Sequence, residues 1–166
     1  MTTSGYTDEQ MERRASSKWT LVQMILAPLQ FLTFIISLIL IIRYLTTGEG
    51  YEIATASVII KIALLWVITI TGMFWEKEMF GQWFLAKEFF WEDALNAVAL
   101  FMHNLYFVAL LLGWNEQDLM LLMLVAYISY LVNFAQFLVR GLRARKQRLA
   151  AADNANAQTP VTATND

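Results

Sequence analysis

The stretch WTLVQMILAPLQFLTFIISLILII, from Trp19 to Ile42, contains no formally charged residue. A helix needs about 20 residues to cross the hydrocarbon core of a bilayer, so this run is long enough to span it. The run also exceeds the apolar region of a signal peptide, which is roughly 7 to 15 residues long. Arg43 follows it without a small-residue cleavage site. We therefore expect a membrane helix that is retained in the protein.

The composition of the whole chain agrees with a membrane protein. Of its 166 residues 58% are hydrophobic and only 16% are charged, whereas soluble domains carry about 25% charged residues. Three further runs, at about 53–75, 94–115 and 119–139, are long enough to cross a bilayer, and Lys61 is their only formally charged residue. We predict an all-α polytopic membrane protein in which four transmembrane helices, the first at about 19–42, form a bundle.

The basic residues predict how the helices are oriented, because lysine and arginine resist translocation. They gather before the first run, between the second and third runs, and after the fourth: Arg13, Arg14, Lys18, Lys77, Lys87, Arg140, Arg143, Arg145, Lys146 and Arg148. The two remaining connections hold acids and only Arg43 among basic residues. We expect the N-terminus, the C-terminus and the connection 76–93 to face the cytoplasm.

The two ends of the chain differ in composition from its centre. Residues 152–166 are small and polar and contain no aromatic residue, and such segments bury too little apolar surface to become ordered. We expect a flexible N-terminal tail at 1–14, a transmembrane domain at 15–148 and a disordered C-terminal tail at 149–166. The chain has no cysteine, which excludes disulfides, thiolate metal sites and thiol redox chemistry.

The central connection mixes aromatic rings and acids unusually densely. It lies within GMFWEKEMFGQWFLAKEFFWED, from Gly72 to Asp93. An aromatic belt at the membrane surface explains the rings but not the acids beside them. Gly81 would let this segment turn back toward the membrane, where partial desolvation raises the pKa of a carboxylic acid and makes it a proton donor near neutral pH. The pattern favours a site for a large apolar substrate that undergoes proton chemistry.

Polar residues within the spans follow one stripe on each helix, and these stripes show where the helices meet. For Gln23, Gln30, Ser37 and Ser129 we favour hydrogen bonds between helices, which occur in proteins without an active site. Lys61 is open to two interpretations. Its ammonium group either snorkels to the outer surface or pairs with a buried acid.

His103 is the single histidine of the chain and shares a helix face with Glu92 and Asn96. A bis-histidine haem needs two such ligands and a zinc site three or four ligands, so one chain cannot build either from imidazole. A buried, hydrogen-bonded packing role is the main alternative to a functional one. In a functional role, His103 would ligate a substrate's magnesium axially or take part in proton transfer.

Five short stretches are distinctive in combination, although none is by itself a catalytic signature. They are LAPLQF (26–31), YLTTGEGY (44–51), WEKEMFGQ (75–82), FFWED (89–93) and VNFAQF (132–137). Together they resemble the vinyl bacteriochlorophyllide hydratase family of photosynthetic bacteria. The similarity extends from about residue 15 to residue 143.

This resemblance implies a hydro-lyase of bacteriochlorophyll biosynthesis, which adds water to the 3-vinyl group of chlorophyllide a or a bacteriochlorophyllide and gives the 3-(1-hydroxyethyl) derivative. It implies no cofactor, no metal of the protein's own and no nucleic acid partner. The implied setting is the lipid bilayer of a bacterial inner or intracytoplasmic photosynthetic membrane. Self-association and contacts with other pigment-synthesis enzymes stay open.

Hydration of a vinyl group requires an acid and a base, and the substrate requires apolar and polar contacts. The candidate catalytic residues are Glu76, Glu78, Glu92 and Asp93, and the candidate substrate-binding residues are His103, Asn96, Asn133, Gln136, Trp75, Trp83 and Trp91. Two other classes of function remain compatible with the sequence. A non-catalytic chlorin-binding or assembly protein would need His103 and not the acids, and a small transporter would use Lys61 as its ionisable site.

Overall fold

The computed structural model describes residues 8–87 and 89–158, and all regular structure in this part of the chain is helical. Five helices follow one another: α1 (Asp8–Ser16), α2 (Lys18–Thr47), α3 (Tyr51–Phe80), α4 (Phe90–Leu111) and α5 (Glu116–Gln158). Four of these, α2 to α5, contain stretches long and apolar enough to cross a membrane. The prediction of an all-α protein with four membrane-spanning helices is confirmed.

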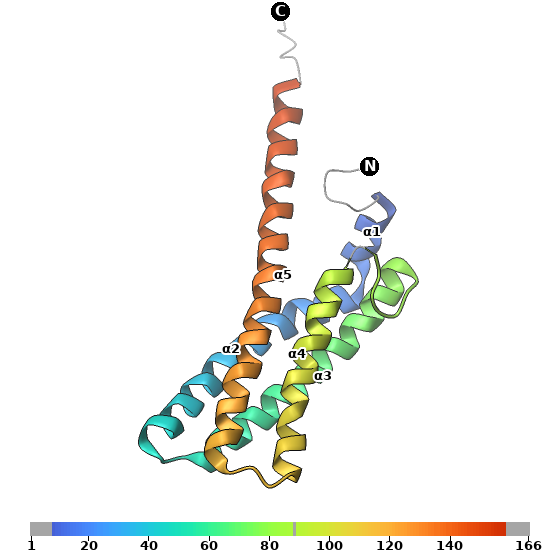
Figure 1. The fold of residues 1–166 in the computed structure, drawn as a ribbon. Coiled ribbons are helices and arrows are strands. Elements are labelled where there is room, and N and C mark those ends of the chain that lie inside the picture. Colours follow the sequence, from blue (N-terminus) through green and yellow to red (C-terminus); the bar gives the residue numbers. More distant parts are fainter. Residues whose placement is uncertain (1–7, 88, 159–166) are drawn as a thin grey trace, which may run out of the picture.

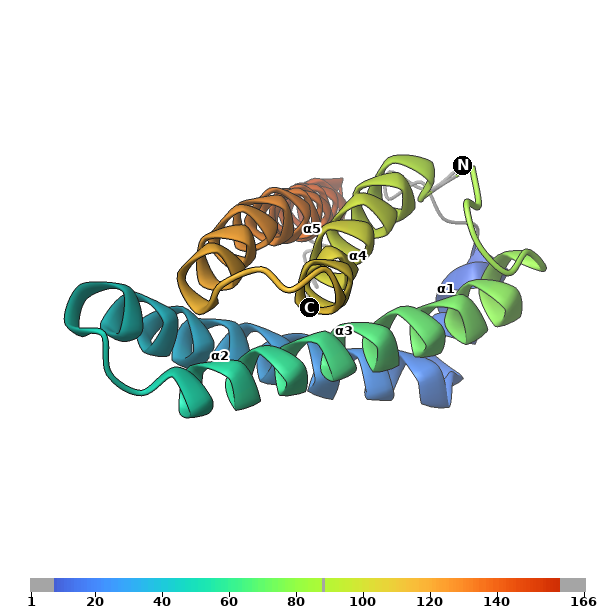
Figure 2. The same cartoon turned by 60° about the horizontal axis from the view of Figure 1, so that its bottom comes forward.

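The four long helices form two hairpins, α2 with α3 and α4 with α5 (Figure 1). Figure 2 shows these hairpins as two layers, with the α2–α3 pair on one side and the α4–α5 pair on the other. The short turns that close the two hairpins lie at the same end of the bundle. The α3–α4 connection, α1 and the extension of α5 lie at the opposite end.

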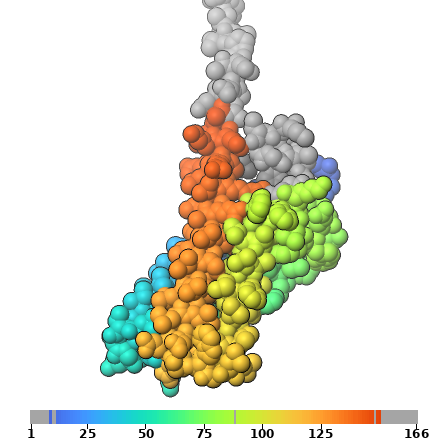
Figure 3. All heavy atoms as spheres, viewed as in Figure 1, coloured from blue at the N-terminus to red at the C-terminus, as the bar shows by residue number. Residues whose placement is uncertain are grey.

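The helices run further than the apolar spans on which their prediction depends. The connection between α3 and α4 is residues 81–89 rather than 76–93, and α5 continues past residue 149. Figure 3 shows α5 extending beyond the end of α4. Apolar runs mark only the hydrocarbon part of a helix, whereas backbone hydrogen bonding continues into the polar region. The flexibility of both tails stays a prediction, and residues 1–7 and 159–166 lie outside the described residues.

Local hydrogen bonds close the ends of the helices. Ser17 caps the start of α2, where its hydroxyl accepts from the backbone N–H groups of Trp19 at 3.2 Å and Thr20 at 3.4 Å. Gly48 ends the same helix with φ at 75°, and its N–H donates to the carbonyl oxygen of Tyr44. Glycine enters this left-handed region without steric cost, so it ends the helix sharply.

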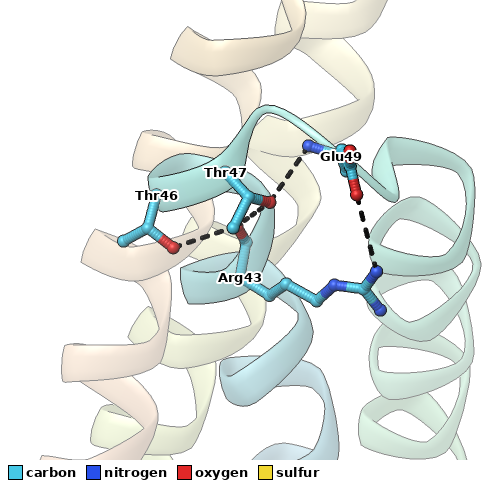
Figure 4. A network of polar contacts seen from close by, with 4 residues as sticks. All are labelled: Arg43, Thr46, Thr47 and Glu49. Atoms are coloured by element: carbon cyan, nitrogen blue, oxygen red, sulfur yellow. Dashed lines mark hydrogen bonds and ion pairs between the residues drawn. The ribbon is translucent and has the colours of Figure 1, made fainter.

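The turn between α2 and α3 is held by a small polar network (Figure 4). The hydroxyls of Thr46 and Thr47 donate to the carbonyl oxygen of Arg43 at 3.1 and 2.8 Å. The Thr47 hydroxyl also accepts from the N–H of Glu49 at 3.2 Å, and a guanidinium nitrogen of Arg43 lies 4.0 Å from the Glu49 carboxylate. These contacts are exposed, so they shape the turn more than they stabilise the fold.

The buried apolar core fills the half of the bundle near the two short turns. Its members come from all four long helices and include Phe34, Ile41, Val58, Tyr106, Met120, Met123 and Tyr127. Two serines join the helices within this core. The hydroxyls of Ser37 and Ser57 lie 2.7 Å apart, and Tyr127 donates to Ser37 at 2.6 Å. The expected role of Ser37 in bonding between helices is therefore confirmed.

Candidate active site

In the other half of the bundle, the two hairpins enclose a cavity of about 410 Å³. Small-molecule sites usually have volumes of about 300–1,000 Å³. Apolar side chains from the long helices form much of its wall: Met24, Ala27, Leu65, Ile68, Phe134 and Phe137. Met24 is 67% exposed and Phe137 is 44% exposed, so the wall reaches the outer surface of the bundle at α2 and α5.

Two acids lie on the cavity wall next to the α3–α4 connection. Glu76 comes from the last turns of α3 and Asp93 from the first turn of α4, and their exposed fractions are only 5% and 6%. The two carboxyl groups are close enough to interact electrostatically. Two neighbouring carboxyl groups in a poorly solvated site resist ionising together, because each negative charge disfavours the other. Such a pair suits acid–base catalysis, which needs one group that gives a proton and one that takes it.

The α3–α4 connection holds both acids through successive backbone amides. The N–H of Leu85 donates to Asp93 Oδ2 at 2.8 Å, and the N–H of Ala86 is 3.4 Å from Glu76 Oε2. Leu85 has φ at 57°, an uncommon left-handed conformation for a residue other than glycine. Gly81, with φ at 74°, ends α3 and starts this turn. The unusual backbone thus coincides with the point where the two acids meet.

The other two candidate acids are engaged elsewhere. Glu92 accepts from Arg140 of α5 at 2.6 Å, and the guanidinium carbon of Arg140 lies 3.8 Å from the centroid of the Phe89 ring. Glu78 is exposed and accepts from the hydroxyl of Ser17 at 2.9 Å. Neither acid lines this cavity. Of the four candidate acids, only Glu76 and Asp93 therefore face it together.

The three candidate tryptophans have different surroundings. Trp75 lines the cavity, donates from its indole N–H to the Thr20 hydroxyl at 2.9 Å, and meets the Phe89 ring edge-on at 5.3 Å between centroids. Trp83 is half exposed and Trp91 is 70% exposed, and neither lines the cavity. Such exposed rings fit the interfacial belt better than a binding pocket.

The remaining predicted binding residues lie at different depths. Asn96 and Asn133 both line the cavity, and Asn96 also accepts a long 3.5 Å hydrogen bond from Asn133. Gln136 lines a separate groove beside Glu92 and Arg140. His103 is fully buried outside the cavity wall, with Nδ1 2.7 Å from the carbonyl oxygen of Ala99. Magnesium ligation by His103 therefore stays a prediction.

A family model described as 2-vinyl bacteriochlorophyllide hydratase matches residues 6–143. The chain belongs to this family. A curated 2-vinyl bacteriochlorophyllide hydratase of Rhodobacter capsulatus is 48% identical over 150 residues, which cover 90% of this chain and 86% of the relative. One of the same name from Cereibacter sphaeroides is 49% identical over 146 residues, covering 88% and 91%. No solved structure matches the chain.

Membership of the hydratase family confirms the resemblance drawn from the sequence motifs.

The structure also tests the expectations for the polar residues within the spans. Lys61 is fully buried and forms none of the ion pairs between described residues, so it neither snorkels outward nor pairs with an acid there. Ser129 bonds to the carbonyl oxygen of Ala126 on its own helix, contrary to expectation. Gln23 does bond between helices, to Thr71 at 2.8 Å.

Several cavity residues were not among the individual candidates. Gly72, Phe84 and Phe89 belong to the aromatic and acidic stretch that indicated a site, whereas Tyr130 and Phe134 of α5 carry no such signal in the sequence. Aromatic residues are common in every span of this hydratase-family chain. Only the packing of the two hairpins distinguishes those that line the cavity from those that face lipid.

Proposed function

We propose that this chain is a hydro-lyase that adds water to the vinyl group of a chlorophyllide or bacteriochlorophyllide and forms a 1-hydroxyethyl group. The vinyl position is the one numbered 2 in the names of the relatives and 3 in current tetrapyrrole numbering. The observation that carries the proposal is the Glu76–Asp93 pair on the wall of an otherwise largely apolar cavity. Family membership supports the same reaction.

The first step needs a proton donor beside the terminal carbon of the vinyl group. We assign this role to Glu76, in its protonated form, with Asp93 beside it as the carboxylate. Transfer of its proton to the terminal carbon leaves positive charge on the adjacent carbon, where the conjugated macrocycle delocalises it. The carboxylate of Asp93 stabilises that charge because both groups lie in a poorly solvated site.

The second step adds water to the cationic carbon. A lone pair of the water oxygen forms the new C–O bond while Asp93 accepts a proton from that water. Asp93 is then the protonated acid and Glu76 the carboxylate. Return of the proton from Asp93 to the neighbouring Glu76 restores the starting state of the pair, and no redox partner is needed.

The wall of the cavity supplies the binding contacts. Trp75, Phe84 and Phe89 offer aromatic faces to a flat macrocycle, and Asn96 and Asn133 offer amide groups. Glu78 and Glu92 hold local structure in this proposal. Trp83 and Trp91 anchor the chain at the membrane surface.

The setting follows from the fold and the charge distribution. Four spans make a multi-pass protein in contact with lipid. The positive-inside rule supports termini and an α3–α4 connection on the cytoplasmic side of a bacterial inner or intracytoplasmic membrane. The carboxyl pair would then lie near the cytoplasmic surface, where water is available.

The test uses membranes that contain the protein, incubated with chlorophyllide a in heavy-oxygen water without added cofactor. The product should gain one water whose oxygen carries the label, and its visible spectrum should change as the vinyl group leaves the conjugated system. The double variant Glu76→Gln with Asp93→Asn, inserted at equal amount, should bind the pigment without converting it. Tight binding by the wild-type protein with no mass change would contradict a hydratase.

A further inference from the structure

One basic side chain lines the same cavity as the two acids. Among the described residues of the cavity wall, Arg14 is the only lysine or arginine. It comes from α1, and the first stretch that is long and apolar enough to cross a membrane begins after it, at Lys18. Arg14 therefore marks the polar end of a cavity whose other walls belong to the membrane-spanning helices.

The short helix α1 is held against the bundle. It contacts both α2 and α3. Ser17, between α1 and α2, ties this corner to the end of α3, because its hydroxyl donates to Glu78 at 2.9 Å while it caps the start of α2. Figure 1 shows α1 at the same end of the bundle as the α3–α4 connection. Arg14 thus lies at the end of the cavity that also contains the two acids.

The neighbouring arginine has a different setting. The side chain of Arg13 is 51% exposed and pairs with Glu9 at 2.5 Å, and Arg13 does not line the cavity. Arg14 is less exposed. Consecutive residues of a helix point about 100° apart, so only one of two adjacent arginines faces the bundle. The two side chains carry the same charge but only one of them reaches a ligand in the cavity.

The rest of the wall is unfavourable for an anion. Much of it is apolar, and a carboxylate without a partner is costly to bury there. Glu76 and Asp93 would repel a second negative charge. A guanidinium offers five N–H donors in a planar fork that matches a carboxylate, and it can bind a ligand in addition to groups of the protein. The cavity therefore suits an apolar molecule whose acidic group lies at Arg14.

A chlorophyllide has this combination of properties. Its macrocycle is large and apolar, and it carries a flexible propionate arm that ends in a carboxylate. The arm is on a pyrrole ring next to the ring that bears the vinyl group. A pigment whose vinyl group meets the two acids can therefore extend its propionate toward the polar end of the cavity.

We infer that Arg14 binds the propionate carboxylate of the pigment and thereby holds the vinyl group within reach of Glu76 and Asp93. This inference rests on the proposed function. Arg14 is then a substrate-binding residue supplied by α1, and it takes no part in moving protons. The contact distinguishes the free acid from an ester, because an esterified arm has lost the negative charge that the guanidinium attracts.

The test compares two forms of a pigment whose vinyl group is reduced to ethyl, so that it binds but cannot be hydrated. One form is the free acid and the other is its methyl ester. Affinities come from fluorescence titration of the protein in lipid nanodiscs, corrected for uptake by empty nanodiscs. The wild-type protein should bind the acid about tenfold more tightly, the lower end of what a hydrogen bond to a charged group contributes. Equal affinity for both forms would overturn the inference.

Replacing the arginine should remove this preference. In Arg14→Gln the acid should bind about tenfold more weakly than in the wild-type protein, while the affinity for the ester stays the same. Arg14→Met carries the same expectation and is used if the glutamine variant does not insert. A purely structural role of Arg14 would weaken binding of acid and ester alike, and that result would contradict the contact.

Two controls test whether the effect belongs to this arginine. Arg13→Gln removes the same charge one position away and should keep the wild-type preference. Arg143→Gln should also keep it, although Arg143 lines the groove beside Glu92. Equal loss of preference in Arg13→Gln and Arg14→Gln would reduce the effect to general attraction by basic residues. Loss in Arg143→Gln alone would place the carboxylate in the groove. Either result would overturn the inference.

Hydration of the vinyl pigment separates this inference from the function on which it rests. In Arg14→Gln the KM for the free acid should rise about tenfold while kcat stays within about twofold, because the contact is to the propionate arm and not to the vinyl group. A wild-type protein that hydrates acid and ester with equal KM would refute the contact alone. A wild-type protein that hydrates neither would refute the hydratase proposal.

Discussion

Glu76 and Asp93 belong to different helices, yet their carboxyl groups accept from the backbone amides of two consecutive residues, Ala86 and Leu85. One short turn therefore sets the position of both acids. The same turn contains the left-handed Leu85, at φ 57°. A residue in a sparsely populated backbone conformation persists only where its surroundings hold it. Here those surroundings include the two carboxyl groups themselves.

Replacing Glu76 with glutamine should lower the rate of hydration by about 10²–10⁴-fold, the range for loss of a general acid. The amide cannot donate a proton to carbon, but its size preserves the cavity, so pigment binding should persist. Product mass under single-turnover conditions measures the effect. Glu78→Gln is the matched control two positions away, and should stay within about twofold of the wild-type rate because its side chain is exposed. Equal losses in both variants would contradict the assignment.

Leu85 allows a test of the strained turn. Leu85→Ile should destabilise the protein by about 1–3 kcal/mol, because a β-branched side chain is strongly disfavoured in a left-handed conformation. Leu85→Gly should retain or raise the unfolding temperature, since glycine adopts this conformation freely. Thermal unfolding of the detergent-solubilised protein measures both. A glycine variant less stable than the isoleucine variant would show that the side chain matters more than the backbone.

The space beside Gly72 is part of the cavity. A Cβ there would meet only the amide nitrogen of Gln23, at 3.7 Å, so a larger side chain can enter without a backbone clash. Gly72→Leu should fill the site and weaken pigment binding roughly tenfold or more, comparable to the effect of added methylenes in other pockets. Fluorescence titration with chlorophyllide measures the affinity. Gly141→Leu is the control, because a Cβ at Gly141 meets open space, and it should bind normally.

The ion pair of Glu92 with Arg140 ties the start of α4 to α5. A double-mutant cycle with Glu92→Gln and Arg140→Met should give a coupling free energy of about 1–2 kcal/mol, because one partner is buried and the other partly so. Chemical unfolding of the single and double variants measures it. Additive effects would show that each side chain contributes separately.

The number of membrane-spanning helices was predictable because each span is a long apolar run. A chain segment inside a bilayer must satisfy its own backbone hydrogen bonds, and a helix does so within one segment. Family membership was predictable from five short motifs. Glu76 and Asp93 were recognisable among four candidate acids, but the sequence did not indicate that these two form a pair. Their selection depends on the backbone of residues 85 and 86, and a left-handed leucine has no sequence signature.

The partners of the α2 stripe could be predicted only in part. Gln23, Gln30 and Ser37 were expected to form hydrogen bonds between helices, and all three do so with α3. The repeat does not record which α3 residue each one meets, so the contact of Gln30 with the buried Lys61 has no signal in the sequence. That choice depends on how the helices pack together.

Met24 and Phe137 line the cavity and are also exposed on the outer surface of the bundle, in helices that are apolar enough to cross a membrane. The cavity wall is therefore continuous with a surface that lipid would cover. An apolar pigment dissolved in the bilayer could then reach the buried acids from the side, without first leaving the membrane.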